Sequence, residues 1–189
     1  QGIVVEKTTD FTILFLFSIG ITKGKWGTLL NALLDFKRDY DDNVELELCL
    51  PDLLAANQTR YAGMGIKDLA DEIFAAMKKH KTTANMAQAF GTLPQAEFSP
   101  VEAYEKLVRN EIERVTLEEA AGRIAATGIV PYPPGIPLLM PGENAGAADG
   151  PLLAYLKALE AFDKSFPGFT HDTHGIESEG GVYRLLVLK

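Results

Sequence analysis

The sequence predicts an α+β fold in which helices and strands are intermixed along 189 residues. Apolar residues recur at three- and four-residue spacing in several stretches, as they do on one face of an amphipathic helix. Between these stretches stand short apolar runs rich in β-branched residues, which are typical of strands. No internal repeat relates the segments to one another. A content of 47% apolar and 23% charged residues is that of a globular protein.

The first part of the chain predicts two strands and one long helix. Residues 2–7, GIVVEK, are interpreted as a short strand. Residues 12–21, TILFLFSIGI, are almost continuously hydrophobic, which is typical of a strand buried on both faces. Thr22 is placed to cap a helix, which the acidic run RDYDDN ends. We expect a domain boundary near residues 41–51, where this acidic break is followed by Pro51.

The rest of the chain predicts further helices and ends in a strand. Ser99 and Glu102, with a proline at the first helical position, have the spacing of a capped helix start. Thr116 and Glu119 repeat the same capping pattern. The predicted elements are helices over 52–56, 66–80 and 86–90, a helix from 99, a strand over 111–115, a helix over 152–166 and a strand over 180–189.

Residues 127–143, TGIVPYPPGIPLLMPGE, contain five prolines. Each proline fixes φ, removes an N–H and favours extended geometry before it. The stretch therefore predicts an extended segment that turns at Pro133-Pro134-Gly135 and again at Pro141-Gly142. Its main polar side chains are Tyr132 and Glu143. Two interpretations stay open: a stiff support that holds a side chain at a site, or a structural turn at a domain edge.

Composition limits the classes of function. A net charge of −8 and a pI near 4.9 argue against nucleic acid and anionic membranes as partners. The single cysteine, Cys49, excludes an internal disulfide and fits a reducing, cytoplasmic location. The longest apolar run, residues 11–21, is too short to span a bilayer, and no signal peptide is indicated. The chain begins without Met inside a strand-like pattern, so we expect it to be the C-terminal portion of a longer protein.

No stretch predicts a catalytic or metal site. Residues 171–174, HDTH, offer two imidazoles and a carboxylate, but no third ligand stands out, and a surface loop between helix and strand is expected. The glycine-containing stretches 20–27 and 63–67 match no full phosphate-binding motif and are expected to be helix starts. Residues 78–81, KKHK, suit a helix C-terminus. By residue chemistry alone the chain is not a self-sufficient enzyme.

Four stretches resemble the C-terminal third of the bacterial ornithine/lysine/arginine decarboxylases, which are pyridoxal-phosphate enzymes of the aspartate-aminotransferase fold. They are TTDFTILFLFSIGITKGKWGTLLNALLDFKRDYD, AGRIAATGIVPYPPGIPLLMPGEN, FPGF and HGIE…GVYRLLVLK. The resemblance runs from Gly2 to Lys189. It implies that residues 1–44 are the end of the cofactor domain, in the small sub-domain of a fold-type I enzyme. Residues 45–189 would then be the family's separate α+β C-terminal domain.

The resemblance also implies that the chemical centre lies upstream of this chain. The family's Schiff-base lysine stands in a Ser-x-His-Lys motif, and His80-Lys81 does not match it because Lys78 occupies the serine position. We therefore expect no catalytic, cofactor-binding or metal-binding residue here and no activity from the chain alone. Its expected role is to form the outer wall of the substrate site.

Three residues are expected at that wall. In the lysine and ornithine branches a glutamate at the position of Glu6 faces the substrate's distal amine; on sequence alone, Glu6 is a surface ion pair with Lys7 or a neighbour. Tyr132 and Glu143 fall on the family's proline-rich block, which approaches the same mouth. The alternative for this block is that it packs the C-terminal domain on the cofactor domain, which we favour for Glu143.

The resemblance leaves the substrate open among basic amino acids. TKGKWGTL and PYPPGIPLLMPGEN resemble the arginine branch, which makes agmatine and CO2. GIVVEK resembles the lysine branch, which makes cadaverine and CO2, so lysine is favoured over arginine, with ornithine third. The family forms homodimers with active sites near the subunit interface, and often larger rings, so a homodimer or a decamer is expected. The family is also associated with acid tolerance. A non-catalytic assembly domain is the alternative function.

Overall fold

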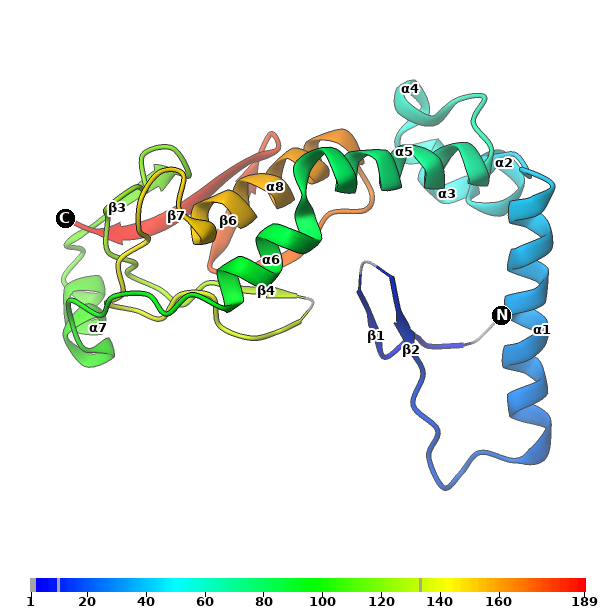
Figure 1. Ribbon diagram of the computed structural model, residues 1–189, viewed down its shortest axis with the longest axis horizontal. Coiled ribbons are helices and arrows are strands. Elements are labelled where there is room, and N and C mark those ends of the chain that lie inside the picture. The colour runs from blue at the N-terminus through cyan, green and yellow to red at the C-terminus, as the bar shows by residue number, and fades with distance from the viewer. Residues whose placement is uncertain (1–2, 10, 133) are drawn as a thin grey trace. The chain divides into compact units, whose positions relative to one another are not determined.

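The structure is a computed structural model that describes residues 3–9, 11–132 and 134–189. It divides into two compact units, residues 1–76 and 77–189, each of which is described here by itself (Figure 1). Helix α5, Ile66–His80, begins in the first unit and ends in the second. Helices and antiparallel strands are intermixed in chain order, which confirms the α+β class.

The first unit is mainly helical. The long helix α1 begins directly after Thr22 and ends in the acidic run, as predicted, although the Thr22 side chain makes no capping hydrogen bond. The elements before α5 are β1 Lys7–Thr8, β2 Ile13–Leu14, α1 Lys23–Asp41, α2 Leu46–Cys49, α3 Pro51–Ala56 and α4 Gln58–Tyr61.

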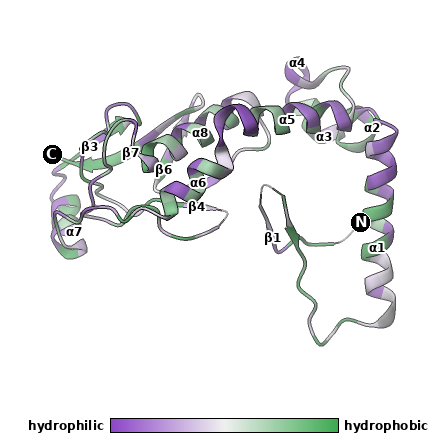
Figure 2. Cartoon of the chain, in the orientation of Figure 1, coloured by the Kyte–Doolittle hydropathy of each residue, from purple (hydrophilic) through white to green (hydrophobic). Residues whose placement is uncertain are grey.

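The prediction of a doubly buried strand over residues 12–21 is wrong for this structure. Strand β2 has two residues and pairs only with the equally short β1. Among the described residues that follow β2, Phe15 is partly buried, whereas Leu16, Phe17 and Ile19 are exposed, Ile19 fully. Figure 2 shows the segment between β2 and α1 as hydrophobic. The large exposed apolar side chains from Phe11 to α1 are Phe11, Ile13 and Leu14 in and before β2, and Leu16, Phe17, Ile19 and Ile21 after it.

Two side chains, those of Asn43 and Asp68, accept backbone N–H groups at the start of α5 and also hydrogen-bond to each other. The side-chain oxygen of Asn43 accepts the backbone N–H groups of Lys67 and Asp68 at 3.0 and 3.3 Å. The Asp68 carboxylate accepts the Gly65 N–H at 2.9 Å and an N–H of the Asn43 amide at 3.0 Å. The first N–H groups of a helix lack intrahelical partners, so these bonds stabilise the helix start. Residues 63–67 are therefore a helix start, as predicted.

In its described residues, the second unit combines two antiparallel sheets with three helices and the end of α5. Its elements are α6 Thr82–Phe90, α7 Pro100–Val108, β3 Ile112–Thr116, β4 Val130–Tyr132, α8 Pro151–Ser165, β5 Asp172–His174, β6 Ile176–Glu179 and β7 Val182–Leu188. One sheet has the strand order β3-β7-β6 and the other pairs β4 with β5. The capping box at α7 is formed by Ser99 and Glu102, as predicted. Thr116 and Glu119 make the same pair of contacts at a turn.

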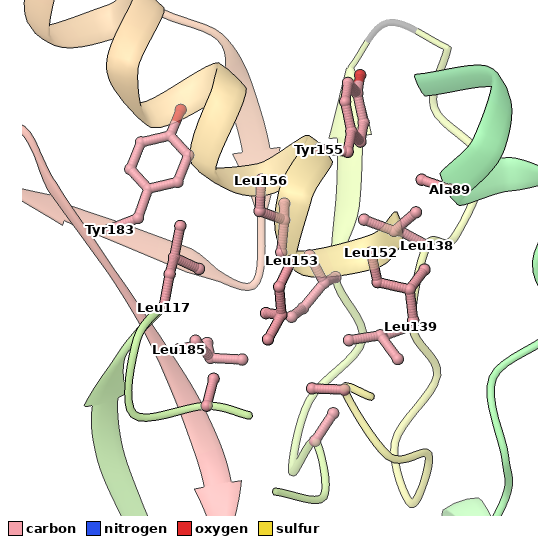
Figure 3. Packing of buried hydrophobic residues seen from close by; sticks show 14 of the residues in the cluster. Ala89, Leu117, Leu138, Leu139, Leu152, Leu153, Tyr155, Leu156, Tyr183 and Leu185 are labelled. Carbon is pink, nitrogen blue, oxygen red and sulfur yellow. The ribbon is translucent and has the colours of Figure 1, made fainter. Parts of the chain in front are cut away.

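The core of the second unit lies around α8, which packs against α6 and β7. Helix α8 is buried along most of its length because its apolar residues recur at helical spacing. Strand β7 alternates, with Tyr183, Leu185 and Val187 buried. Figure 3 shows Leu153 and Leu156 of α8 directed into the same cluster as Leu185. This core fixes the positions of β4 and β5, which carry the candidate site.

Candidate functional site

The proline-rich segment forms two arms that meet at their base. The Ile129 N–H donates to the Leu139 carbonyl at 2.9 Å, and the Leu138 N–H donates to the Ile129 carbonyl at 2.8 Å. Residues 134–135 and 141–142 are turns, as predicted. Pro133, which the first predicted turn also includes, lies outside the described residues. The stretch is thus a closed, stiff loop whose outgoing arm is β4.

Tyr132 stands at the exposed end of this arm. Pro131 before it is fully buried, whereas the Tyr132 side chain is 45% exposed. The Gly135 N–H donates to the Pro131 carbonyl at 2.9 Å, which folds the turn back over the tyrosine. A Cβ atom on Gly135 would lie 3.0 Å from ring atom Cδ2 of Tyr132, and Gly135 has a φ of +77°. The positive φ favours glycine there, and the turn lies against the tyrosine ring.

Glu143 makes a structural contact at the second turn. Its Oε2 accepts the Met140 N–H at 2.7 Å, and its backbone N–H donates to the Met140 carbonyl at 3.2 Å. The Ala125 N–H in turn donates to the Glu143 carbonyl at 2.8 Å. The carboxylate therefore closes the Pro141-Gly142 turn. This is a contact within the second unit, so the substrate role and the domain-packing role of Glu143 both stay predictions.

The prediction of a surface loop at HDTH is wrong, because Asp172–His174 form strand β5. It pairs antiparallel with β4 in the register Val130↔His174, Pro131↔Thr173 and Tyr132↔Asp172. Residues directly opposite each other in an antiparallel pair point to the same face. Pro131 and Thr173 are both buried. Tyr132 and Asp172 therefore share the opposite, exposed face of the ribbon.

A buried polar network that the sequence reasoning missed anchors β5. Asp163 on α8 is 6% exposed, and its two carboxylate oxygens accept the His171 N–H at 3.1 and 3.2 Å. Atom Nδ1 of the His171 ring lies 2.7 Å from Asp163 Oδ1, and the Tyr183 hydroxyl donates to Asp163 Oδ2. The available signal was the helical spacing, which places Asp163 on the apolar face of residues 152–166.

Glu160, one turn before Asp163, adds a second buried carboxylate. Its Oε1 accepts the Tyr183 backbone N–H at 2.7 Å, and its Oε2 lies 3.2 Å from the Lys164 ammonium. Burial, followed by the neighbouring Asp163 carboxylate, raises the pKa of the Tyr183 phenol well above its usual range. Tyr183 therefore remains a neutral hydrogen-bond donor, which suits a structural network better than acid–base chemistry.

Glu6 lies in the first unit, directly before β1. Its backbone N–H donates to the Leu14 carbonyl at 3.0 Å, so the residue belongs to the small β1–β2 hairpin. The side chain is exposed. Tyr132 and Glu143 share the proline-rich loop of the second unit, and Glu6 does not belong to that unit. The roles of all three residues stay predictions.

A shallow depression of about 450 Å³ lies elsewhere on the second unit. It is lined by residues 92–95, Gly122, 144–147 and 150–152, and none of the three predicted site residues lines it. In the part of the chain that the structure describes, no group of three His, Cys, Asp or Glu side chains is arranged to hold a metal ion. Among these residues no helix is long and apolar enough to cross a membrane.

Comparison with known proteins supplies the family. The family described as "Orn/Lys/Arg decarboxylase, C-terminal domain" matches residues 83–189, more than half of the chain. The chain belongs to this family. The biodegradative arginine decarboxylase of Escherichia coli is 48% identical over all 189 residues, and lysine decarboxylase LdcA of Pseudomonas aeruginosa is 47% identical over 96% of the chain.

A solved structure extends the match to three dimensions. The constitutive lysine decarboxylase of E. coli is 44% identical, covers the whole chain and has a TM-score of 0.92. The chain spans only about a quarter of the length of these relatives, at 25% of the arginine enzyme and 27% of the lysine enzyme structure. The resemblance read from the four sequence stretches is therefore confirmed. The boundary between residues 44 and 45 stays a prediction.

Proposed function

We propose that these 189 residues are the C-terminal part of a cytoplasmic, pyridoxal-phosphate-dependent decarboxylase of basic amino acids, which works as a homodimer or a larger ring. The observation that carries the proposal is the match over the whole chain to relatives named arginine and lysine decarboxylases. In this proposal residues 1–44 end the cofactor domain, and residues 45–189 cover the substrate site and support dimerisation.

The described residues do not by themselves fit the cofactor. Pyridoxal phosphate is held through a Schiff-base lysine inside an enclosed pocket that buries most of the cofactor. None of the lysines whose side chains the structure describes is buried. Lys81 follows His80, as the lysine follows histidine in the family's Ser-x-His-Lys motif. It is exposed, with a φ of +51°, between α5 and α6. The electron-withdrawing chemistry therefore belongs to the longer protein, and these residues position and enclose the substrate.

Lysine is the proposed substrate, with arginine the runner-up. The similarity values do not separate them, since the named arginine and lysine relatives are 48% and 47% identical. The argument for lysine is Glu6, because a single carboxylate suits a compact ammonium, whereas a guanidinium prefers a planar, bidentate partner. A non-catalytic assembly domain remains the second candidate, and the exposed apolar surface of the first unit favours an association role alongside catalysis.

The test is Glu6→Gln in the full-length protein, assayed with lysine, arginine and ornithine. The amide keeps the size of the side chain and removes its charge. We expect KM for lysine to rise and kcat/KM to fall about tenfold to a hundredfold, the scale of one hydrogen bond to a charged group. Glu47→Gln, at an exposed carboxylate on α2, is the matched control and should leave the kinetics unchanged.

Three outcomes separate the alternatives. Wild-type kinetics in Glu6→Gln would mean that Glu6 does not contact the substrate and would remove the reason for preferring lysine. A full-length wild-type protein that turns over none of the three amino acids would refute the decarboxylase and leave the assembly role. Turnover by the 189 residues alone would contradict a chemical centre outside this chain.

A further inference from the structure

We propose that the exposed face of the β4–β5 ribbon, made by Tyr132 and Asp172 with His174 beside them, binds the cationic side chain of the substrate. In this proposal Asp172 supplies the charge that selects a basic amino acid. The proposal rests on the proposed function for its substrate class and adds a specificity-determining residue to it.

The strand register places the two residues together. Tyr132 and Asp172 are direct cross-strand partners, and such partners have Cβ atoms about 5 Å apart. Pro131 and Thr173, at the next register position, are buried on the other face. The side chains of Asp172 and His174 are each 71% exposed. The aromatic ring and the carboxylate thus stand side by side on the outward face.

The chemistry of this pair suits an organic cation. A carboxylate accepts charge-assisted hydrogen bonds from an ammonium or guanidinium group, and the face of a tyrosine ring attracts the same cation. The His174 ring, with Nε2 3.7 Å from Asp172 Oδ2, lies at the edge of the pair. An anionic or purely apolar side chain would gain neither interaction, so the face discriminates by charge.

The ribbon is anchored at both ends, which keeps the face in place. Before Asp172, the buried Asp163 carboxylate holds the backbone and the ring of His171. After His174, Gly175 has a φ of +82°, and a Cβ atom there would lie 2.0 Å from the Gly128 carbonyl oxygen. Only glycine allows this close approach between the end of β5 and the start of the proline-rich arm. A held site loses less conformational entropy when it binds.

The experiment compares Asp172→Asn with wild type in the full-length decarboxylase, using the basic amino acid that it turns over best. We expect KM to rise about two- to fivefold with kcat nearly unchanged, the scale of an exposed ion pair. The difference should fade at about 1 M salt, where the Debye length is about 3 Å. Asp172→Glu should recover most of the loss because it restores the charge. Asp149→Asn removes the same charge at an exposed site and should change nothing.

An unchanged KM in Asp172→Asn, or an equal rise in Asp149→Asn, overturns the proposal. A loss of fold in Asp172→Asn that Asp172→Glu repairs without restoring KM also overturns it. If the wild-type protein decarboxylates no basic amino acid, the proposed function fails first. Calorimetric titration of that protein with cadaverine and agmatine then tests the face itself: binding lost in Asp172→Asn supports it, and binding independent of Asp172 refutes it.

Discussion

The two units of this chain are both rich in apolar residues but differ in how much of that surface they bury. Among the described residues of the first unit, the buried hydrophobic side chains are Leu46, Tyr61 and Leu69. The second unit has a continuous core built around α8, in which seventeen of the described residues form one buried cluster. The first unit also exposes large apolar side chains on the segment after β2 and along α1, Trp26 and Phe36 among them.

The comparison shows that two units with similar apolar content can differ in how much of their apolar surface they bury by themselves. The second unit places an amphipathic helix against an alternating strand, so each element covers the apolar face of the other. In the first unit, α1 makes two ion pairs with its own side chains, Lys37 with Asp41 and Asp35 with Arg38, all substantially exposed. Such surface pairs contribute little stability. An exposed apolar surface of this kind is typical of one that another layer of protein covers.

Dissecting the chain should give the largest effect. Residues 66–189 keep α5 whole together with the core of the second unit, and we expect them to unfold in one cooperative step in urea. Residues 1–80 also keep α5 but have few buried contacts, so we expect a gradual loss of helix and binding of a hydrophobic dye. Circular dichroism and dye fluorescence measure both. A sharp urea transition of residues 1–80 would refute the comparison.

Truncating one leucine in each unit should give an intermediate effect. Leu153 is fully buried in the core around α8, and Leu153→Ala should lower the free energy of unfolding of the whole chain by about 2–5 kcal/mol. Leu33 on α1 is 43% exposed, and Leu33→Ala should change it by no more than about 0.5 kcal/mol. Urea titrations of the two variants make the measurement. Equal losses would mean that the first unit has a core of its own.

Capping carboxylates should give the smallest effect. The Glu119 carboxylate accepts the backbone N–H and the hydroxyl of Thr116, both at 2.9 Å, which holds its pKa below the ordinary value of 4.5. Because the pKa is lowered by folding, this stabilisation is present above the unfolded-state pKa and is lost as the pH falls through the folded one. Glu119→Gln should therefore melt below wild type at neutral pH, and the two should converge as the pH falls through the lowered folded-state pKa of Glu119.

Glu118→Gln is the adjacent control and should melt with the wild type, since Glu118 is exposed. The equivalent change in the first unit is Asp68→Asn, at a carboxylate whose pKa is lowered by Asn43 and Gly65. It should reduce helix content without moving the cooperative transition. If Asp68→Asn did shift that transition, the two units would have to unfold together as one cooperative unit.

Local signals in the sequence determined the helices and their ends. The range predicted for α5 agrees with the structure residue for residue, and the start of α7 follows from Ser99, Pro100 and Glu102, because caps and helical periodicity act over a few residues. The turns of the proline-rich loop follow in the same way, since proline restricts its own φ and that of the residue before it. The resemblance to the decarboxylase family was likewise identified from four contiguous stretches of sequence.

Only the tertiary structure decided which distant residues meet. Nothing in HDTH indicates that Asp172 pairs with Tyr132, forty positions away, because strand register depends on which faces the core buries. The burial of Asp163 beneath His171 and Tyr183 arises in the same way from the packing of α8 on β7. The continuous hydrophobicity of residues 12–21 predicted burial on both faces. Such burial needs a second layer of protein, and most of these apolar side chains are exposed among the described residues of the first unit.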